Sequence, residues 1–131
     1  MFEEIYRAIL EGMAFQSWLA YEKLRALGTR METITATGGG AASALALQIR
    51  ADVFDMPVLT LENDESGTLG CMMMAAVADG AYASAEEAFR RAVRTGRSYL
   101  PDPARHAAYM KKYERYKRLY DLMHGFIDPK G

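Results

Sequence analysis

The sequence predicts an α/β fold in which short parallel strands are flanked by helices. Two short runs rich in β-branched residues alternate with segments of helical hydrophobic periodicity. Strands that are joined by helices pair in parallel through right-handed crossovers. The length of 131 residues suits about one domain, and a hydrophobic fraction of 50% with 25% charged residues is typical of globular proteins.

The first expected element is a helix over residues 2–27. Apolar side chains recur along one side of it at three- and four-residue steps, at Phe2, Tyr6, Ile9, Met13, Ala20, Leu24 and Leu27. Ile5, Trp18 and Leu19 add apolar groups on other sides, so we expect a central helix sandwiched between layers. Gly28 ends this helix, because glycine readily takes the backbone conformation of a helix C-terminus.

The remaining elements are first alternating strands and helices and then, towards the C-terminus, helices alone. They are expected in this order: a strand at 31–37, a helix at 43–54, a strand at 57–61, helices at 67–78 and 84–94, a connector at 99–103 and a helix at 104–123. Polar residues at 63–66 cap the third helix, and Ser84 with Glu87 form a capping box for the fourth. The chain therefore divides into a helix-strand-helix-strand-helix core at 1–82 and C-terminal helices at 83–131.

Two strands form too small a sheet for this number of helices, because sheets average about five or six strands. We therefore expect further strands from another chain or from a larger protein of which this sequence is a piece. The outer edge of the strand at 31–37 should be unpaired or covered by a neighbouring chain, because open edges invite pairing. Self-association, or pairing with the missing portion, follows from this expectation.

The net charge of −1 conceals an uneven distribution of charge. Residues 1–85 carry −6 and residues 86–118 carry +6. The basic residues alternate with alanines and with a stripe of tyrosines at helical spacing, namely Tyr109, Tyr113, Tyr116 and Tyr120. This pattern favours a solvated helix face with the tyrosines packed in the core, so we expect no nucleic-acid partner.

Several classes of protein are excluded by what the sequence lacks. No stretch approaches the ~18–20 apolar residues of a membrane helix, and the acidic N-terminus is unlike a secretory signal. The single cysteine, Cys71, rules out an internal disulfide framework and is expected to be a buried, inert thiol. His106 and His124 are too far apart for a local metal motif. We therefore expect a cytoplasmic protein with no metal site in this chain.

The segment TGGGA at 37–41 is the arrangement with the clearest chemical meaning. A strand that ends in glycines and turns directly into a helix lets a ligand approach the backbone closely. The helix N-terminus adds N–H groups and a partial positive charge, which suit a phosphate. The same three glycines could serve only to make a tight turn, and this interpretation stays open.

Two known phosphate-binding loops can be compared with this segment. The P-loop requires a lysine, and none occurs between Lys23 and Lys111. The dinucleotide fingerprint G-x-G-x-x-G fits Gly38 and Gly40 but meets Ser43 at its third position, and Glu62 lies near the distance expected for its acidic residue. A dinucleotide-binding module of the NAD type therefore remains an alternative, although a long leading helix is unusual for it.

Five blocks of sequence, in order along the chain, resemble the C-terminal domain of the FGGY carbohydrate kinases. They are RAILEGMAF at 7–15, TGGGAASALALQIRAD at 37–52, MPV at 56–58, ESGTLGCMMMAAVADGAY at 65–82 and PDPARHAAYMKKYERYKRLY at 101–120. Each block is weak by itself, but together they cover nearly the whole chain. The resemblance implies part of an actin-like, ribonuclease-H-like C-terminal lobe.

In that family two such lobes close around ATP and a sugar, and the glycine segment belongs to the adenosine site. The resemblance therefore implies nucleotide binding by Gly38, Gly39, Gly40, Ala41, Ser43 and Ala44. The backbone of the loop would lie against the nucleotide, and Ser43 or Ala44 would lie near the adenine edge. Many relatives carry asparagine or proline at the position of Ala44, so one base contact is lost here. Gln48 and Asp52 match the family and have either a ligand role or a local hydrogen-bonding role.

The resemblance also implies what this chain does not contain. The family's lobe begins with three antiparallel strands, which are expected upstream of Met1 together with the N-terminal lobe, the catalytic aspartate and the sugar site. We therefore expect a C-terminal portion of a kinase that uses ATP with Mg²⁺ to phosphorylate a ketose or polyol, with xylulose-like sugars favoured. The chain alone should be inactive, with no catalytic residue of its own. A non-enzymatic interaction or oligomerisation module is the remaining alternative.

Overall fold

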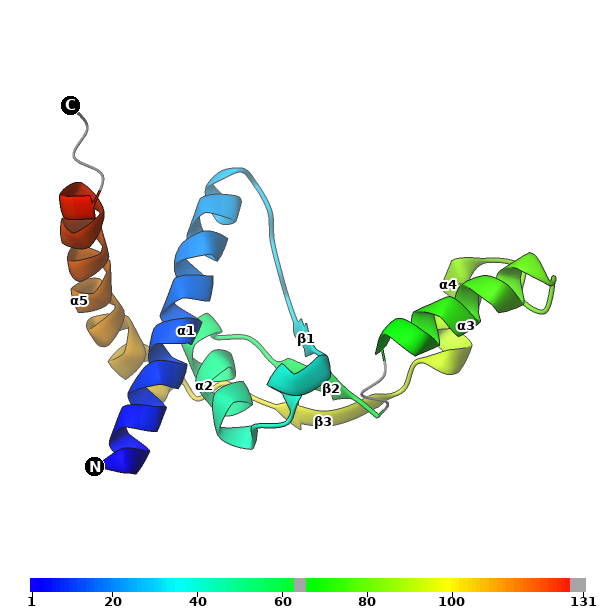
Figure 1. Ribbon diagram of the computed structural model, residues 1–131, viewed down its shortest axis with the longest axis horizontal. Coiled ribbons are helices and arrows are strands. Elements are labelled where there is room, and N and C mark those ends of the chain that lie inside the picture. The colour runs from blue at the N-terminus through cyan, green and yellow to red at the C-terminus, as the bar shows by residue number, and fades with distance from the viewer. Residues whose placement is uncertain (63–65, 128–131) are drawn as a thin grey trace.

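The computed structural model describes residues 1–62 and 66–127 (Figure 1). Its elements, in chain order, are α1 (Phe2–Ala26), β1 (Ile34–Ala36), the 3₁₀ turn η1 (Gly38–Ala41), α2 (Ala44–Phe54), β2 (Val58–Leu61), α3 (Ser66–Ala78), α4 (Ala85–Ala92), β3 (Thr95–Tyr99) and α5 (Pro103–Ile127). Every element expected from the sequence is present within a few residues of its expected bounds. The cap expected at 63–66 falls largely on residues 63–65, which lie outside the described residues.

The three strands form one mixed sheet in the order β1-β2-β3. β1 pairs in parallel with β2, and β3 pairs antiparallel with β2. β1 is therefore an edge strand within the described part of the chain, as expected. The expectation of a purely parallel sheet was wrong, because β3 arises in the region 83–131, where only helices and a connector were expected.

The strand β3 could not be predicted from the sequence, because its residues, TGRSY, are mostly exposed and show no apolar alternation. It exists because β2 offers it a backbone partner. Thr60 strengthens this pairing, since its hydroxyl accepts the Arg97 N–H at 2.8 Å and donates to the Arg97 carbonyl at 3.4 Å. An irregularity of the ladder between Leu59 and Leu61 lies at the same place.

The helix α2 occupies the centre of the molecule, between the sheet and the pair α1 and α5 (Figure 1). One apolar cluster lies between the three helices and includes Phe15, Trp18 and Tyr113. A second cluster lies between α2 and the sheet and consists of Ala36, Leu47, Ala51 and Val58. α2 is thus buried on two sides, as an apolar helix between layers should be.

The helix α1 is less central than its composition predicts. It packs against α2 and α5, but Ile5, Ile9 and Met13 are each more than half exposed. The expectation that α1 is sandwiched between layers is therefore wrong for the described residues, because no element of this chain covers its second apolar face.

Polar contacts fasten α5 to α1 around the tyrosine stripe, which packs in the core as expected. The Tyr113 hydroxyl donates to Glu22 at 2.6 Å, and burial together with this carboxylate raises the pKa of Tyr113. Glu11 is nearly buried and accepts from Arg7 and Lys112, each at 3.0 Å. Burial opposes its charge, but the bonds from Lys112 and Arg7 outweigh burial and hold the pKa of Glu11 below its usual value.

The helices α3 and α4 form a separate arm that extends beyond the ends of β2 and β3 (Figure 1). α3 has no charged residue, yet none of its residues is buried, and its main contacts are with α4. Cys71 on α3 is exposed, so the expectation of a buried thiol was wrong. The described strands do not cover α3, so the apolar surface of this helix is exposed in the part of the chain that the structure describes. Among the described residues, no helix has both the length and the hydrophobicity needed to cross a bilayer.

The close pairing of β2 with β3 generates a prediction for Gly96→Ala. A methyl group at this position would lie 2.8 Å from Thr60 Oγ1 and 3.3 Å from the backbone carbonyl of Leu61. We expect the free energy of unfolding to fall by about 1–3 kcal/mol, as overpacked sites generally show, measured by urea denaturation.

Gly12→Ala is the matched control, because a methyl group there meets nothing within 4 Å in the middle of α1. This variant should be as stable as the parent chain or more stable by up to about 1 kcal/mol. Equal stability of Gly96→Ala and the parent would contradict the described pairing.

Candidate functional site

The glycine segment forms a single 3₁₀ turn between the end of β1 and the start of α2. Thr37 is extended, and Gly38 then takes a φ of +69°, a conformation that side chains disfavour. The Ala42 N–H donates to the Gly39 carbonyl at 3.3 Å and closes the turn. This compact turn places the backbone of the glycines at the carboxyl end of a parallel strand, where ligands of α/β sheets commonly bind.

The space in front of the turn is open. A methyl group added to Gly39 or Gly40 would meet no atom within 4 Å, and both residues are exposed. Ser43 is the N-cap of α2, and its hydroxyl accepts the Ala46 N–H at 3.3 Å. The helix N-terminus therefore faces the same region with its partial positive charge. Ala44 is exposed at the first position of α2.

A cavity of about 410 Å³ adjoins the turn. It is lined by Ala41 and Ala42 from the turn and its exit, by Thr60 of β2 and Arg97 of β3, and by Glu62 directly after β2, among others. Glu62 was singled out from the sequence by its distance from the glycines, and the structure brings it to the same cavity. Arg97 was missed, because no strand was expected between the helix that ends at 94 and the connector that begins at 99.

Arg97 and Glu62 give the cavity both signs of charge. The backbone of Arg97 is fixed by its two hydrogen bonds with Thr60. Its side chain is exposed and has no ion pair within residues 1–62 and 66–127. A guanidinium suits a phosphate, whereas a carboxylate suits sugar hydroxyl groups. The cavity thus combines exposed backbone, a guanidinium and a carboxylate.

Among residues 1–62 and 66–127, no three side chains of histidine, cysteine, aspartate or glutamate come together as a metal centre built from the protein alone would need.

Gln48 and Asp52 lie on α2 and do not line this cavity. The Asp52 carboxylate is 2% exposed and accepts from Arg105 Nε at 2.8 Å and from the Asp102 N–H at 2.9 Å. Gln48 donates to Asp52 at 3.1 Å and to the Leu100 carbonyl at 2.9 Å. Both residues therefore have a hydrogen-bonding role, but only the bond between Gln48 and Asp52 is local as expected, and the others join α2 to distant parts of the chain.

Comparison with known proteins places this chain in a family. Residues 2–78 match the model of the FGGY family of carbohydrate kinases, C-terminal domain. The chain is 32% identical over 114 residues to "Xylulose kinase" of Bacillus subtilis, covering 87% of this chain and 23% of that protein. It is 34% identical over 122 residues to "L-xylulose/3-keto-L-gulonate kinase" of Escherichia coli, covering 93% of this chain and 24% of that protein.

Solved structures show the same relationship in three dimensions. Ligand-bound xylulose kinase from Lactobacillus acidophilus superposes with a TM-score of 0.82 and 29% identity, over 92% of this chain and 24% of that chain. Xylulose kinase from Rhodospirillum rubrum gives a TM-score of 0.79 and 30% identity, over 93% and 25% of the two chains. This chain thus spans about a quarter of its relatives. It belongs to the FGGY family of carbohydrate kinases and corresponds to part of their C-terminal domain.

Proposed function

We propose that this chain forms the adenosine side of the ATP site of a sugar kinase. The complete enzyme would transfer the γ-phosphoryl group of ATP to a hydroxyl group of a ketose or polyol. Xylulose-like sugars are the first candidates, because two curated relatives and two solved structures carry xylulose in their names. We place the enzyme in the cytoplasm, in line with the reduced, single cysteine of this chain.

One observation carries the proposal more than any other. The exposed glycine turn joins the carboxyl end of β1 to the N-terminus of α2 and borders a cavity of about 410 Å³. Backbone N–H groups and a helix N-terminus favour a phosphate, and a cavity beside them has room for the rest of a nucleotide.

Each residue of the site then has a specific role. The backbone of Gly38, Gly39, Gly40 and Ala41 lies along the nucleotide, and Ser43 and Ala44 face the adenine edge. Arg97 reaches a phosphate oxygen, since a guanidinium donates in the geometry that phosphates accept. Glu62 accepts hydrogen bonds from ribose hydroxyl groups. Because Ala44 has no polar side chain, selectivity for the base should be weak.

The transfer itself needs groups that this chain does not contain. Phosphoryl transfer depends on positioning and on Mg²⁺, which neutralises the charge that develops on the phosphates. The described residues form no metal site. We infer that the catalytic aspartate, the metal ligands and the sugar site belong to the rest of the kinase. The isolated chain should bind nucleotide and be inactive.

Two other functions stay open to test. Glu62 lies in one cavity with Ala41 and Ala42, an arrangement that a dinucleotide-binding module of the NAD type would also use. The exposed edge of β1 and the exposed apolar faces of α1 and α3 are features of an interaction or oligomerisation module.

Calorimetric titration of the 131-residue chain with ADP and with NAD separates these functions. We expect ADP to bind more tightly than NAD, and Arg97→Gln to weaken ADP binding about tenfold, the effect of one lost charge-assisted hydrogen bond. Arg94→Gln is the control, because this arginine does not line the cavity.

Tighter binding of NAD would replace the kinase proposal with the dinucleotide module. A folded chain that binds neither nucleotide but forms a stable oligomer in sedimentation would instead favour the interaction module.

Ser43 provides a test of how the turn is held. Ser43→Ala removes the N-cap bond of α2 and should lower the free energy of unfolding by about 1 kcal/mol, measured by urea denaturation. Ser43→Asp keeps a capping oxygen and should retain the stability. The aspartate should nevertheless weaken ADP binding, because it adds a negative charge close to the anionic nucleotide. If Ser43→Asp loses as much stability as Ser43→Ala, the cap is not what holds the turn.

A further inference from the structure

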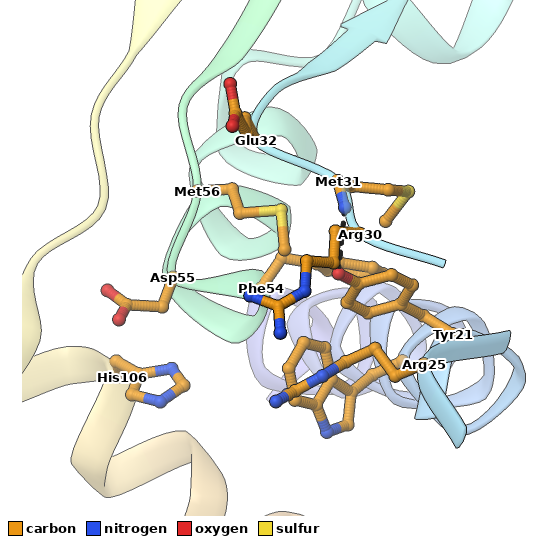
Figure 2. Close-up of a pocket in the computed structure, with 10 residues that line it drawn as sticks. Tyr21, Arg25, Arg30, Met31, Glu32, Phe54, Asp55, Met56 and His106 are labelled. Atoms are coloured by element: carbon orange, nitrogen blue, oxygen red, sulfur yellow. Dashed lines mark hydrogen bonds between the residues drawn. The ribbon is translucent and has the colours of Figure 1, made fainter. Parts of the chain in front are cut away.

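A second cavity, of about 530 Å³, lies at the opposite end of the parallel strands from the glycine turn (Figure 2). Residues 30–32 lead into β1 and residues 55–56 lead into β2, and both segments line it. The C-terminal half of α1 contributes Trp18 and Arg25, and α5 contributes His106. The helices α1 and α5 and the segments that precede β1 and β2 thus surround this cavity.

Arg25 and Arg30 form a basic pole, that is, one positively charged side of the cavity. Figure 2 shows the guanidinium groups of Arg25 and Arg30 directed into the same space. Neither has an ion pair or a side-chain hydrogen bond within the described ranges 1–62 and 66–127. The carboxylates of Glu32 and Asp55 also line the cavity, but in Figure 2 they point away from this space. Positive charge is therefore gathered at one place without a partner.

Trp18 adds an independent observation. Its side chain lines the cavity and is 7% exposed, and its buried Nε1–H has no hydrogen-bond acceptor among the residues that the structure describes. Buried donors without a partner are rare in native proteins, so this group indicates a missing acceptor. The indole N–H and both guanidiniums can only donate hydrogen bonds. An oxygen atom that accepts hydrogen bonds therefore matches all three groups.

The frame around this pole is fixed by hydrogen bonds. The Met31 N–H donates to the Tyr21 hydroxyl at 3.1 Å, which ties the segment that carries Arg30 to α1. His106 Nδ1 donates to the Asp52 carbonyl at 2.9 Å, which ties α5 to the end of α2. These bonds hold the backbone around the cavity, which reduces the conformational entropy lost when an anion binds.

We propose that this cavity binds a phosphate group, either as the free ion or as part of a phosphomonoester. Two guanidiniums offer pairs of donors, and the indole N–H offers a further one, which suits the several oxygens of a phosphate better than a single carboxylate. The volume leaves room for a small organic group attached to the phosphate. This proposal does not rest on nucleotide binding at the glycine turn.

The chain offers a direct probe, because Trp18 is its single tryptophan. The 131-residue chain is titrated with inorganic phosphate and with glycerol 3-phosphate at an ionic strength held constant with chloride. We expect a saturable change in tryptophan fluorescence and a downfield shift of the one indole N–H resonance. Arg25→Gln and Arg30→Gln should each weaken binding about tenfold or more. Arg118→Gln, on an exposed part of α5, should leave it unchanged.

The two ligands distinguish the two sources of phosphate. Equal affinities support a site for the phosphate group alone, and tighter binding of glycerol 3-phosphate supports a site for a phosphomonoester. Arg25 and Arg30 are exposed, so their variants should fold, which circular dichroism checks. No saturable response to either ligand would overturn the proposal. A response that persists unchanged in both folded arginine variants would overturn it equally.

Discussion

The carboxylate of Asp52 is the contact on which the arrangement of this chain depends most. It is buried at the end of α2 and binds both the backbone of Asp102 and the side chain of Arg105. Asp102 lies in the short segment that joins β3 to α5, and Arg105 lies in the first turn of α5. A buried carboxylate is stable only when it is paired and hydrogen-bonded, so its partners must stay in place. One side chain thus holds the last strand and the last helix against the central helix.

The elements that Asp52 holds in place also contribute lining residues to both cavities. β3 lies beside β2 and brings Arg97 to the cavity at the glycine turn, and α5 brings His106 to the cavity at the other end of the strands. The second face of α1, the surface of α3 and the edge of β1 remain open. A packed centre with open surfaces around it agrees with a chain that spans about a quarter of the length of its relatives.

The sequence was sufficient to predict elements whose signals are local. The glycine turn, the Ser84 cap and the start of α5 all follow from residues close together in sequence. β3 could not be predicted, because its stability comes from a ladder with β2 that lies some 37 residues away. Arg97 and the Asp52 contacts were missed for the same reason. The exposure of α1 and α3 was also missed, since apolar periodicity predicts a buried face without saying which element covers it.

The central claim is that the glycine turn binds the nucleotide of a sugar kinase. Backbone amide chemical shifts of the ¹⁵N-labelled chain, recorded during titration with ADP, test it at the level of residues. The account predicts that the largest changes fall on Gly39, Gly40, Ala41 and Ser43, with smaller changes at Arg97 in β3. Changes confined to the residues around Arg25 and Arg30, or no changes in a chain that remains folded, would contradict it.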